Sequence, residues 1–226
     1  MKAAGDTLQF IKNVLPFWGK LDPQHQALLA DSLITKTYAQ GQSVHSGFDD
    51  CSGLAVVFSG QLRAYIVSES GKEITLYRLF ERDVCLFTAS CLLRNINFEI
   101  HVSAERDSRI ILIPARIFDI LNQSNLAVAD YTGQLMSARF SDVMWVMEQV
   151  LFMSFDKRLA LFLLEEAAAE GSDDLKITHD AIARHLGSAR EVVTRMIKYF
   201  QSEGIVSSSR GMLSIIDRKK LEKLAE

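Results

Sequence analysis

Three ionisable side chains, Arg190, Glu191 and Arg195, fall within six consecutive residues in the carboxyl-terminal part of the chain. A guanidinium group can donate two parallel hydrogen bonds to guanine, and a carboxylate can accept one from cytosine. A carboxylate is repelled by phosphates, so this mixture of charges suits contact with base edges better than general contact with a nucleic-acid backbone. Hydrogen bonding to the bases of DNA is therefore the first chemistry that the sequence indicates.

The residues around this cluster predict two short helices that are joined by a tight turn. Thr178 is a good N-cap for the first helix, and Gly187 is placed to end it. Ser188 precedes Glu191 by three residues, which is the spacing of a capping box, so we expect the second helix to start at Ser188. Two short helices joined by a glycine turn are typical of a helix-turn-helix.

The second predicted helix has two chemically distinct faces. At about 100° per residue, one face collects the apolar side chains. The N-terminal part of such a helix contacts base edges. We therefore expect Arg190, Glu191 and Arg195 to contact bases, against the alternative of a solvated amphipathic helix with scattered charges. The residues expected to contact the DNA backbone are Thr178, Ser188, Thr194, Lys198, Ser209 and Arg210.

The charge of the chain is distributed unevenly. The net charge of the 226 residues is −3, but residues 176–223 hold ten Lys and Arg against five Asp and Glu. This local excess indicates one basic face on an acidic protein, as phosphate binding requires. The start of the chain lacks a secretory pattern, and no 18-residue stretch is free of charge. We expect a cytoplasmic protein with no membrane contact.

The chain divides into three predicted domains of an α+β protein. Residues 1–121 contain short β-branched runs with period-two alternation and glycine turns, such as Leu62–Val67, which favours a β-barrel or jelly roll. Residues 122–153 are predicted to form one long helix. Residues 154–226 carry the helix-turn-helix and a final hairpin over Gly204–Ile216, which together predict a winged helix.

The long predicted helix carries apolar residues at the spacing of a coiled-coil seam. The spacings are four, three, four and three residues, and further apolar residues form a second face. A helix that is apolar on two sides must pack against two things. We expect its own domain on one side and a second copy of the chain on the other, whereas the alternative is a core helix in a monomer. The expected dimer contacts are Met136, Phe140, Val143, Met147 and Val150.

The segment from Leu186 to Arg195 is similar to the recognition helix of the Crp–Fnr family of transcription regulators. Arg190, Glu191 and Arg195 match the residues with which the cyclic-AMP receptor branch reads a TGTGA-type half-site. The resemblance covers nearly the whole chain. It implies a β-roll sensor domain (a double-stranded jelly roll related to cyclic nucleotide-binding domains), a homodimer, a palindromic operator in double-stranded DNA, and RNA polymerase as a partner.

The resemblance fails at the sensor pocket. Cyclic-nucleotide members carry a Gly-Glu pair followed by Arg-Ser or Arg-Thr, whereas Phe98 and Glu99 occupy the latter position here, and no glycine occurs between Gly71 and Gly133. A phosphate cradle needs closely approaching backbone N–H groups and a cation. We therefore expect that cyclic AMP is not the effector. The expected pocket residues are Cys85, Phe87, Cys91, Phe98, Glu99, His101, Phe140 and Met144.

Several interpretations of this pocket remain open at the level of sequence. An apolar pocket for a small organic effector is one, and haem or another metal cofactor held by a Cys or His is a second. A thiol switch between Cys85 and Cys91 is a third, and the absence of any ligand is a fourth. An iron–sulfur cluster is disfavoured because the chain has only three cysteines and the first 50 residues contain none.

The rival classes of function have little support in the sequence. No Gly-rich phosphate loop, HExxH or GxSxG motif occurs, so we expect neither an enzyme nor catalytic residues, and we assign no metal ligands. A β-roll scaffold that binds a ligand without DNA is the remaining alternative to a regulator. Specific binding to DNA would separate the two.

Overall fold

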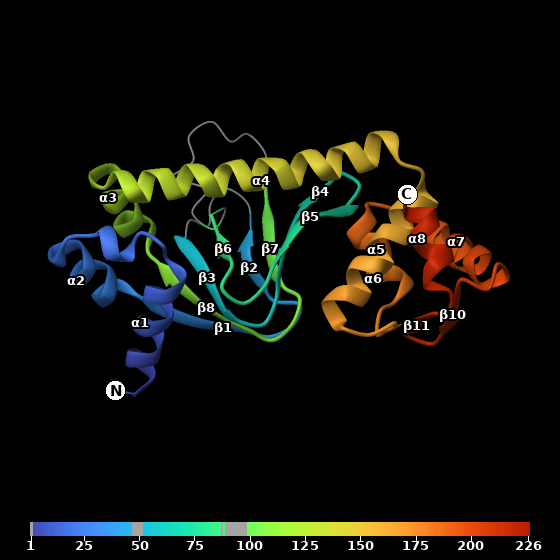
Figure 1. The fold of residues 1–226 in the computed structure, drawn as a ribbon, viewed down its shortest axis with the longest axis horizontal. Coiled ribbons are helices and arrows are strands. Elements are labelled where there is room, and N and C mark those ends of the chain that lie inside the picture. Colours follow the sequence, from blue (N-terminus) through green and yellow to red (C-terminus); the bar gives the residue numbers. More distant parts are fainter. Residues whose placement is uncertain (1, 47–51, 87, 89–98) are drawn as a thin grey trace. The chain divides into compact units, whose positions relative to one another are not determined.

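The computed structural model describes residues 2–46, 52–86, 88 and 99–226, and it confirms the predicted α+β class (Figure 1). The chain forms two compact units. The first contains Met1–Ile66 and Leu76–Val143, and the second contains Val67–Thr75 and Met144–Glu226. Each unit has a hydrophobic core of its own.

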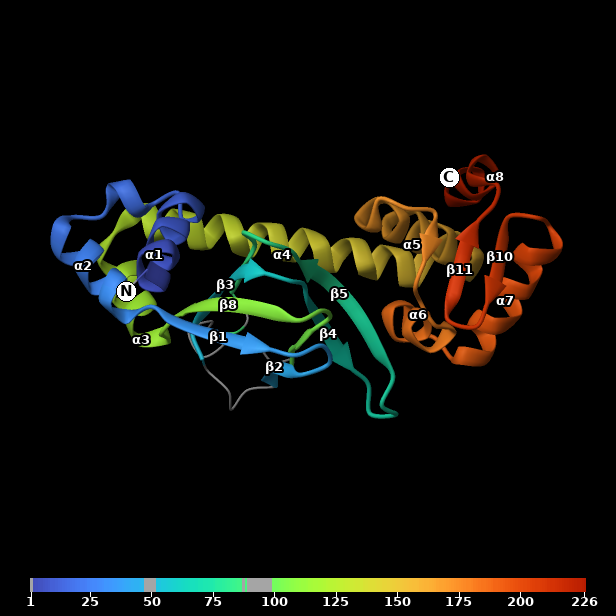
Figure 2. The same ribbon diagram turned by 90° about the horizontal axis from the view of Figure 1, so that it is seen from below.

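The β-roll consists of two antiparallel four-stranded sheets, as the alternating runs predicted. One sheet has the order β1 (Ile34–Tyr38), β8 (Ser108–Ile113), β3 (Leu54–Ser59) and β6 (Val84–Cys85). The other has the order β2 (Ser43–Ser46), β7 (His101–Ala104), β4 (Leu62–Val67) and β5 (Glu73–Leu79). Strands β1 and β8 run side by side in Figure 2, with Ile34 opposite Leu112 and Tyr38 opposite Ser108.

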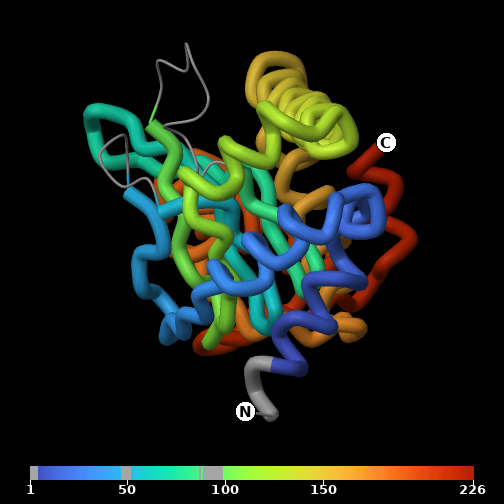
Figure 3. Tube along the Cα trace, turned by 90° about the vertical axis from the view of Figure 1, so that its left-hand side faces the viewer, coloured from blue at the N-terminus to red at the C-terminus, as the bar shows by residue number. Residues whose placement is uncertain are grey.

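Two apolar cores stabilise the first unit, and strand β3 contributes to both. Its residues Ala55 and Val57 enter the core between the two sheets, whereas Leu54 and Val56 enter a core on the other face of their sheet. Burial on both faces explains why β3 is a continuous apolar run without the usual alternation. The outer core is covered by helices that precede and follow the strands of the roll in the sequence (Figure 3). They are α1 (Lys2–Val14), the 3-10 turn η1 (Trp18–Lys20), α2 (Pro23–Ser32) and α3 (Ala115–Ser124).

Helix α4 (Leu126–Phe152) is the long helix that the sequence predicted for residues 122–153. It is uninterrupted over 27 residues. Tyr131, Leu135 and Met136 pack against the outer core of the first unit, and Val143 packs against the core between the sheets. Among the residues that the structure describes, no helix is both long and apolar enough to span a bilayer.

The second unit is a winged helix, as predicted. Around one apolar core it assembles a three-stranded sheet of order β10, β11, β9 and four helices. Leu163, Val193, Phe200 and Leu221 are fully buried there and come from three different helices. The elements are α5 (Phe155–Glu170), β9 (Asp174–Leu175), α6 (His179–Leu186), α7 (Arg190–Ser202), β10 (Val206–Ser209), β11 (Met212–Ile215) and α8 (Arg218–Ala225).

Candidate nucleic-acid interface

The two helices of the predicted helix-turn-helix are α6 and α7. Thr178 caps α6, because its hydroxyl accepts a hydrogen bond of 3.1 Å from the Ala181 N–H. Gly187 ends the helix in the left-handed region at φ 64°, and the N–H groups of Gly187 and Ser188 both donate to the Ala183 carbonyl. A residue with a side chain rarely adopts this conformation, which explains the glycine. Both predicted caps are thus confirmed.

The expected capping box at Ser188 is wrong. Helix α7 begins at Arg190, its N-cap is Ala189, and no side chain caps it. Instead, the Ala189 carbonyl accepts hydrogen bonds from the Val192 and Val193 N–H groups, at 3.0 and 3.2 Å. The left-handed turn already uses the Ser188 N–H, and the N-cap lies one residue further along, at Ala189. Arg190 therefore occupies the first position of α7 and Glu191 the second.

The face of α7 that the sequence predicted to contact bases forms one shallow hollow of about 430 Å³. On the opposite side, Val193, Ile197 and Phe200 are completely buried in the core of the second unit. The helix is therefore held by its apolar side while its polar side faces solvent. The hollow is lined by Arg190, Glu191, Thr194, Arg195 and Lys198.

A second hollow of about 630 Å³ lies between the start of α6, the start of α7 and the wing formed by β10 and β11. It brings together three of the predicted backbone-contact residues, Thr178, Ser209 and Arg210, and it shares Arg190 with the first hollow. Ser188 lines neither hollow and is half-buried in the turn. Two arginines and a single carboxylate, Asp180, line this hollow, so its charge favours an anion.

His179 lies in the second hollow, and the sequence argument assigned it no role. Its Nδ1 is 3.0 Å from the Thr194 hydroxyl on α7, and its Nε2 is 3.5 Å from the Ser208 hydroxyl on β10. Burial of the ring lowers the pKa of His179, and the positive charge of Arg190 lowers it further. In the sequence, only its position next to the N-cap of a helix-turn-helix pointed to His179 as part of this hollow.

Comparisons with known proteins identify the family of this chain. Residues 157–224 match the family model of the Crp-like helix-turn-helix domain. A solved structure from Eubacterium rectale, described as a transcriptional regulator of the Crp/Fnr family, is 52% identical to this chain. It has a TM-score of 0.92 and matches over 94% of this chain and 99% of its own. The chain belongs to the Crp/Fnr family.

More distant Crp/Fnr relatives match over most of their length. The regulatory protein HlyX of Actinobacillus pleuropneumoniae is 27% identical over 81% of this chain and 79% of its own. The fumarate and nitrate reduction regulatory protein of Yersinia pestis is 26% identical over 89% of this chain and 83% of its own. The family resemblance predicted from residues 186–195 is thus confirmed, and the protein is a Crp/Fnr-type transcriptional regulator, in a family whose members bind DNA and dimerise.

Where the structure describes them, the sensor residues expected for this Crp/Fnr protein lie in different surroundings. Cys85 is completely buried in the core between the sheets. His101 precedes Val102, which enters the same core, so the alternation of β7 directs His101 to the opposite face. There it stacks on Tyr65, with ring centroids 5.4 Å apart. Glu99 is exposed, and Phe87, Cys91 and Phe98 lie outside the described residues.

Polar residues that the sequence argument did not select lie beside the core between the sheets. The guanidinium of Arg139 on α4 lies 4.4 Å from the ring centroid of the buried Tyr77, and it forms an ion pair of 2.9 Å with Asp142. Burial and then the neighbouring Cys85 raise the pKa of Tyr77 well above its ordinary value. The sequence could have predicted this ion pair, because Arg139 and Asp142 are three residues apart on an apolar helix. Within the described ranges, no three His, Cys, Asp or Glu side chains are grouped as metal ligands would be.

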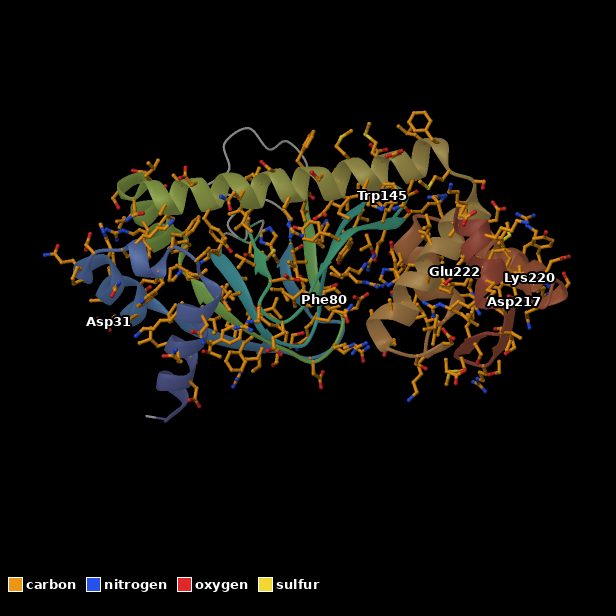
Figure 4. All side chains as sticks on the ribbon, in the orientation of Figure 1. Asp31, Phe80, Trp145, Asp217, Lys220 and Glu222 are labelled. Carbon is orange, nitrogen blue, oxygen red and sulfur yellow. The ribbon has the colours of Figure 1, made fainter. Side chains whose placement is uncertain are left out.

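The predicted dimer residues share one stripe of α4 but differ in burial along it. Met136 and Val143 are partly buried against the cores of the first unit. Phe140, Met147 and Val150 are exposed, Phe140 by 67%. Four neighbouring apolar side chains on α4 are exposed as well, including the Trp145 that Figure 4 labels. Exposed apolar surface of this extent marks an interaction face. Besides Trp145, these exposed neighbours on α4 are Met144, Leu151 and Phe152.

Proposed function

We propose that this protein is a homodimer that binds a palindromic operator in double-stranded DNA and is switched by an effector other than cyclic AMP. The observation that carries the proposal is the hollow on α7, where Arg190, Glu191 and Arg195 face solvent together at the start of a helix whose other side is fixed in a core. In a symmetric dimer, two such helices lie about 34 Å apart and enter successive major grooves.

In this proposal each side chain of the interface has a definite partner on DNA. Arg190 and Arg195 donate to guanines, and Glu191 accepts from a cytosine amino group. The backbone contacts come from both hollows and from the turn between α6 and α7. Phosphate contacts set the register of the protein on the duplex without carrying sequence information themselves. They are assigned to Thr178, Ser188, Thr194, Lys198, Ser209 and Arg210.

The exposed apolar face of α4 supports the homodimer. Phe140, Met147 and Val150 would pack against the same residues of a second copy, as a two-fold axis along this helix requires. We assign sensing to residues 1–121, dimerisation to residues 122–153 and DNA binding to residues 154–226. RNA polymerase is the partner through which a cytoplasmic regulator of this type would act.

Selection of binding sites from a random double-stranded DNA library tests the proposed function. We expect enrichment of a palindrome whose half-sites resemble TGTGA and lie one helical turn apart, because Arg190, Glu191 and Arg195 have the order and spacing of that recognition pattern. Selected duplexes should then shift in electrophoretic mobility assays in a sequence-specific way. Failure to enrich any sequence, with and without cell extract, would favour a β-roll scaffold that does not bind DNA.

The effector is proposed to be a small, largely apolar organic molecule in the first unit. Two residues carry this part of the proposal. Cys85 is buried in an apolar core, and Glu99 is an exposed carboxylate that would repel a cyclic phosphate. Haem held by Cys or His and a thiol switch between Cys85 and Cys91 remain variants of the same regulator. The absorption spectrum and the mass spectrum of the purified protein distinguish these three.

Cyclic AMP is expected to release or absorb no heat of binding when it is titrated into the protein in a calorimeter. The physical reason is the lack of glycine between Gly71 and Gly133 and the presence of Phe98 and Glu99 where a cation would hold the phosphate. A cyclic-AMP-binding family member measured in the same buffer provides the positive control. Micromolar binding by this protein would overturn the proposed effector class.

A further inference from the structure

His179 joins three elements of the second unit through its two ring nitrogens. It is the first residue of α6, its Nδ1 faces Thr194 on the recognition helix α7, and its Nε2 faces Ser208 on the wing. Thr194 lines the hollow that holds the base-contacting residues, whereas Ser208 lines the hollow beside the wing. The ring is therefore placed to set the position of the wing relative to the recognition helix.

Both neighbours of the ring are hydroxyl groups, and this makes its contacts independent of its charge. A hydroxyl can donate or accept, so it pairs with a nitrogen that carries a proton and equally with one that does not. A neutral imidazole donates through one nitrogen and accepts through the other, and an imidazolium donates through both. Protonation of His179 therefore requires rotation of the hydroxyl groups and the loss of no hydrogen bond.

The charges that face His179 keep the ring neutral in the free protein. Its own helix contributes Asp180, α7 contributes Arg190, and the wing contributes Arg210, so two cations and one carboxylate line the hollow. Burial of the ring and the Arg190 guanidinium lower the pKa of His179, and the positive end of α6 acts in the same direction. The neighbouring hollow adds Arg195 and Lys198 against Glu191. These influences favour the neutral ring over the imidazolium in the free protein.

We propose that His179 is a positioning residue that takes up a proton when the protein binds DNA, and that the ring keeps its contacts to the wing and the recognition helix in both charge states. A phosphate that enters the second hollow offsets the charges of Arg190 and Arg210. The proton comes from solvent, and the ring then donates to both Thr194 and Ser208. This inference rests on the proposed DNA-binding function and adds a dependence on pH to it.

The direction of the pH dependence follows from linkage. If the pKa of His179 is higher in the complex than in the free protein, binding consumes protons and must tighten as pH falls between those two pKa values. Above the pKa in the complex and below the pKa in the free protein, His179 contributes no further dependence. Within the window, the affinity gains about tenfold per His179 for each unit by which DNA raises its pKa.

The decisive measurement is the NMR titration of His179 in the wild-type protein, free and bound to the most enriched duplex of the selection. The ring resonances should titrate at a higher pH in the complex. Calorimetry in buffers of different ionisation enthalpy should show net uptake of protons on binding. Fluorescence anisotropy should show affinity rising from pH 8 to pH 6. The ionic strength is held constant because salt screens the phosphates that face this hollow.

A matched pair of substitutions separates His179 from the other histidines. His179→Gln keeps a side chain that can donate and accept but cannot titrate, so we expect the dependence of affinity on pH to flatten. His25→Gln makes the same change in the first unit, where His25 on α2 pairs with Asp22, the N-cap of that helix. This control should retain the wild-type dependence on pH.

The outcomes distinguish the two proposals. If no duplex is enriched and none binds at any pH, the proposed function fails. If a duplex binds specifically but the resonances of His179 titrate at the same pH in both states, the proton-linked role of His179 is wrong, whatever the variants do. Unchanged pH dependence in His179→Gln would contradict it independently. The wild-type NMR result stands even if the variant does not fold.

Discussion

Replacement of Arg195 by alanine is expected to weaken binding to the selected operator by about 1–3 kcal/mol and to relax the preference at one base position. Arg195 lines the hollow on α7 and is exposed, so its loss leaves the core of the second unit intact. The expected loss reflects two parallel hydrogen bonds to one guanine. Fluorescence anisotropy with the operator and with duplexes substituted at each position of the half-site measures both effects.

Two further variants show whether Arg195 contacts a base or a phosphate. Arg195→Lys keeps the charge but loses the planar fork, so we expect it to behave more like alanine than like arginine. Lys198, the site of the second variant, Lys198→Ala, lies one turn further along the same face. This variant should weaken binding to all duplexes to a similar degree and reduce the slope against salt concentration by about one. Unchanged operator binding by Arg195→Ala would show that the assigned base-contacting face is wrong.

The double substitution Phe140→Glu and Met147→Glu is expected to convert a dimer into a monomer and to abolish operator binding at nanomolar protein concentration. Both side chains are exposed on the outer face of α4, so in a single chain the two glutamates face water at little cost. In a symmetric dimer, each would face its own copy across an apolar interface, where an unpaired charge costs several kcal/mol. Sedimentation velocity gives the oligomeric state, and mobility shift gives the binding.

The control for this variant is Gln134→Glu, which adds one negative charge to the same helix. Gln134 is exposed and lies about 120° around the helix from Phe140, outside the stripe formed by Phe140, Met147 and Val150. It should leave both the oligomeric state and operator binding unchanged. Circular dichroism should show the same helix content in all three proteins. A double variant that still sediments as a dimer would place the interface elsewhere.

The elements that depend on neighbours in sequence could be predicted. Thr178 and Gly187 act on residues three or four positions away, and their capping roles follow from residue type alone. The same reasoning failed at Ser188, because two local motifs competed for one segment. The left-handed turn at Gly187 took the backbone N–H of Ser188, and the helix then began at Arg190. Spacing alone could not decide between the motifs.

Contacts between distant segments lay beyond the sequence argument. Nothing local links His179 to Ser208, 29 residues further along, because their distance depends on how the wing folds back. The burial of the seam residues on α4 also depends on distant segments. Spacing places Met136 and Val143 on the same stripe as Phe140, and the cores of the first unit partly bury the first two. Which residues are covered depends on the rotation of the helix against the roll.

Helix α7 begins without a side-chain cap, and this has a consequence for how the regulator could acquire new DNA targets. The helix is positioned by the Gly187 turn, the Ala189 carbonyl and a buried apolar side, none of which touches the hollow where bases are expected. Stability and selectivity therefore reside in different atoms. Substitutions at Arg190, Glu191 or Arg195 can be sampled one at a time without unfolding the domain. Natural variation and laboratory evolution have the same freedom there to retarget the regulator to new promoters.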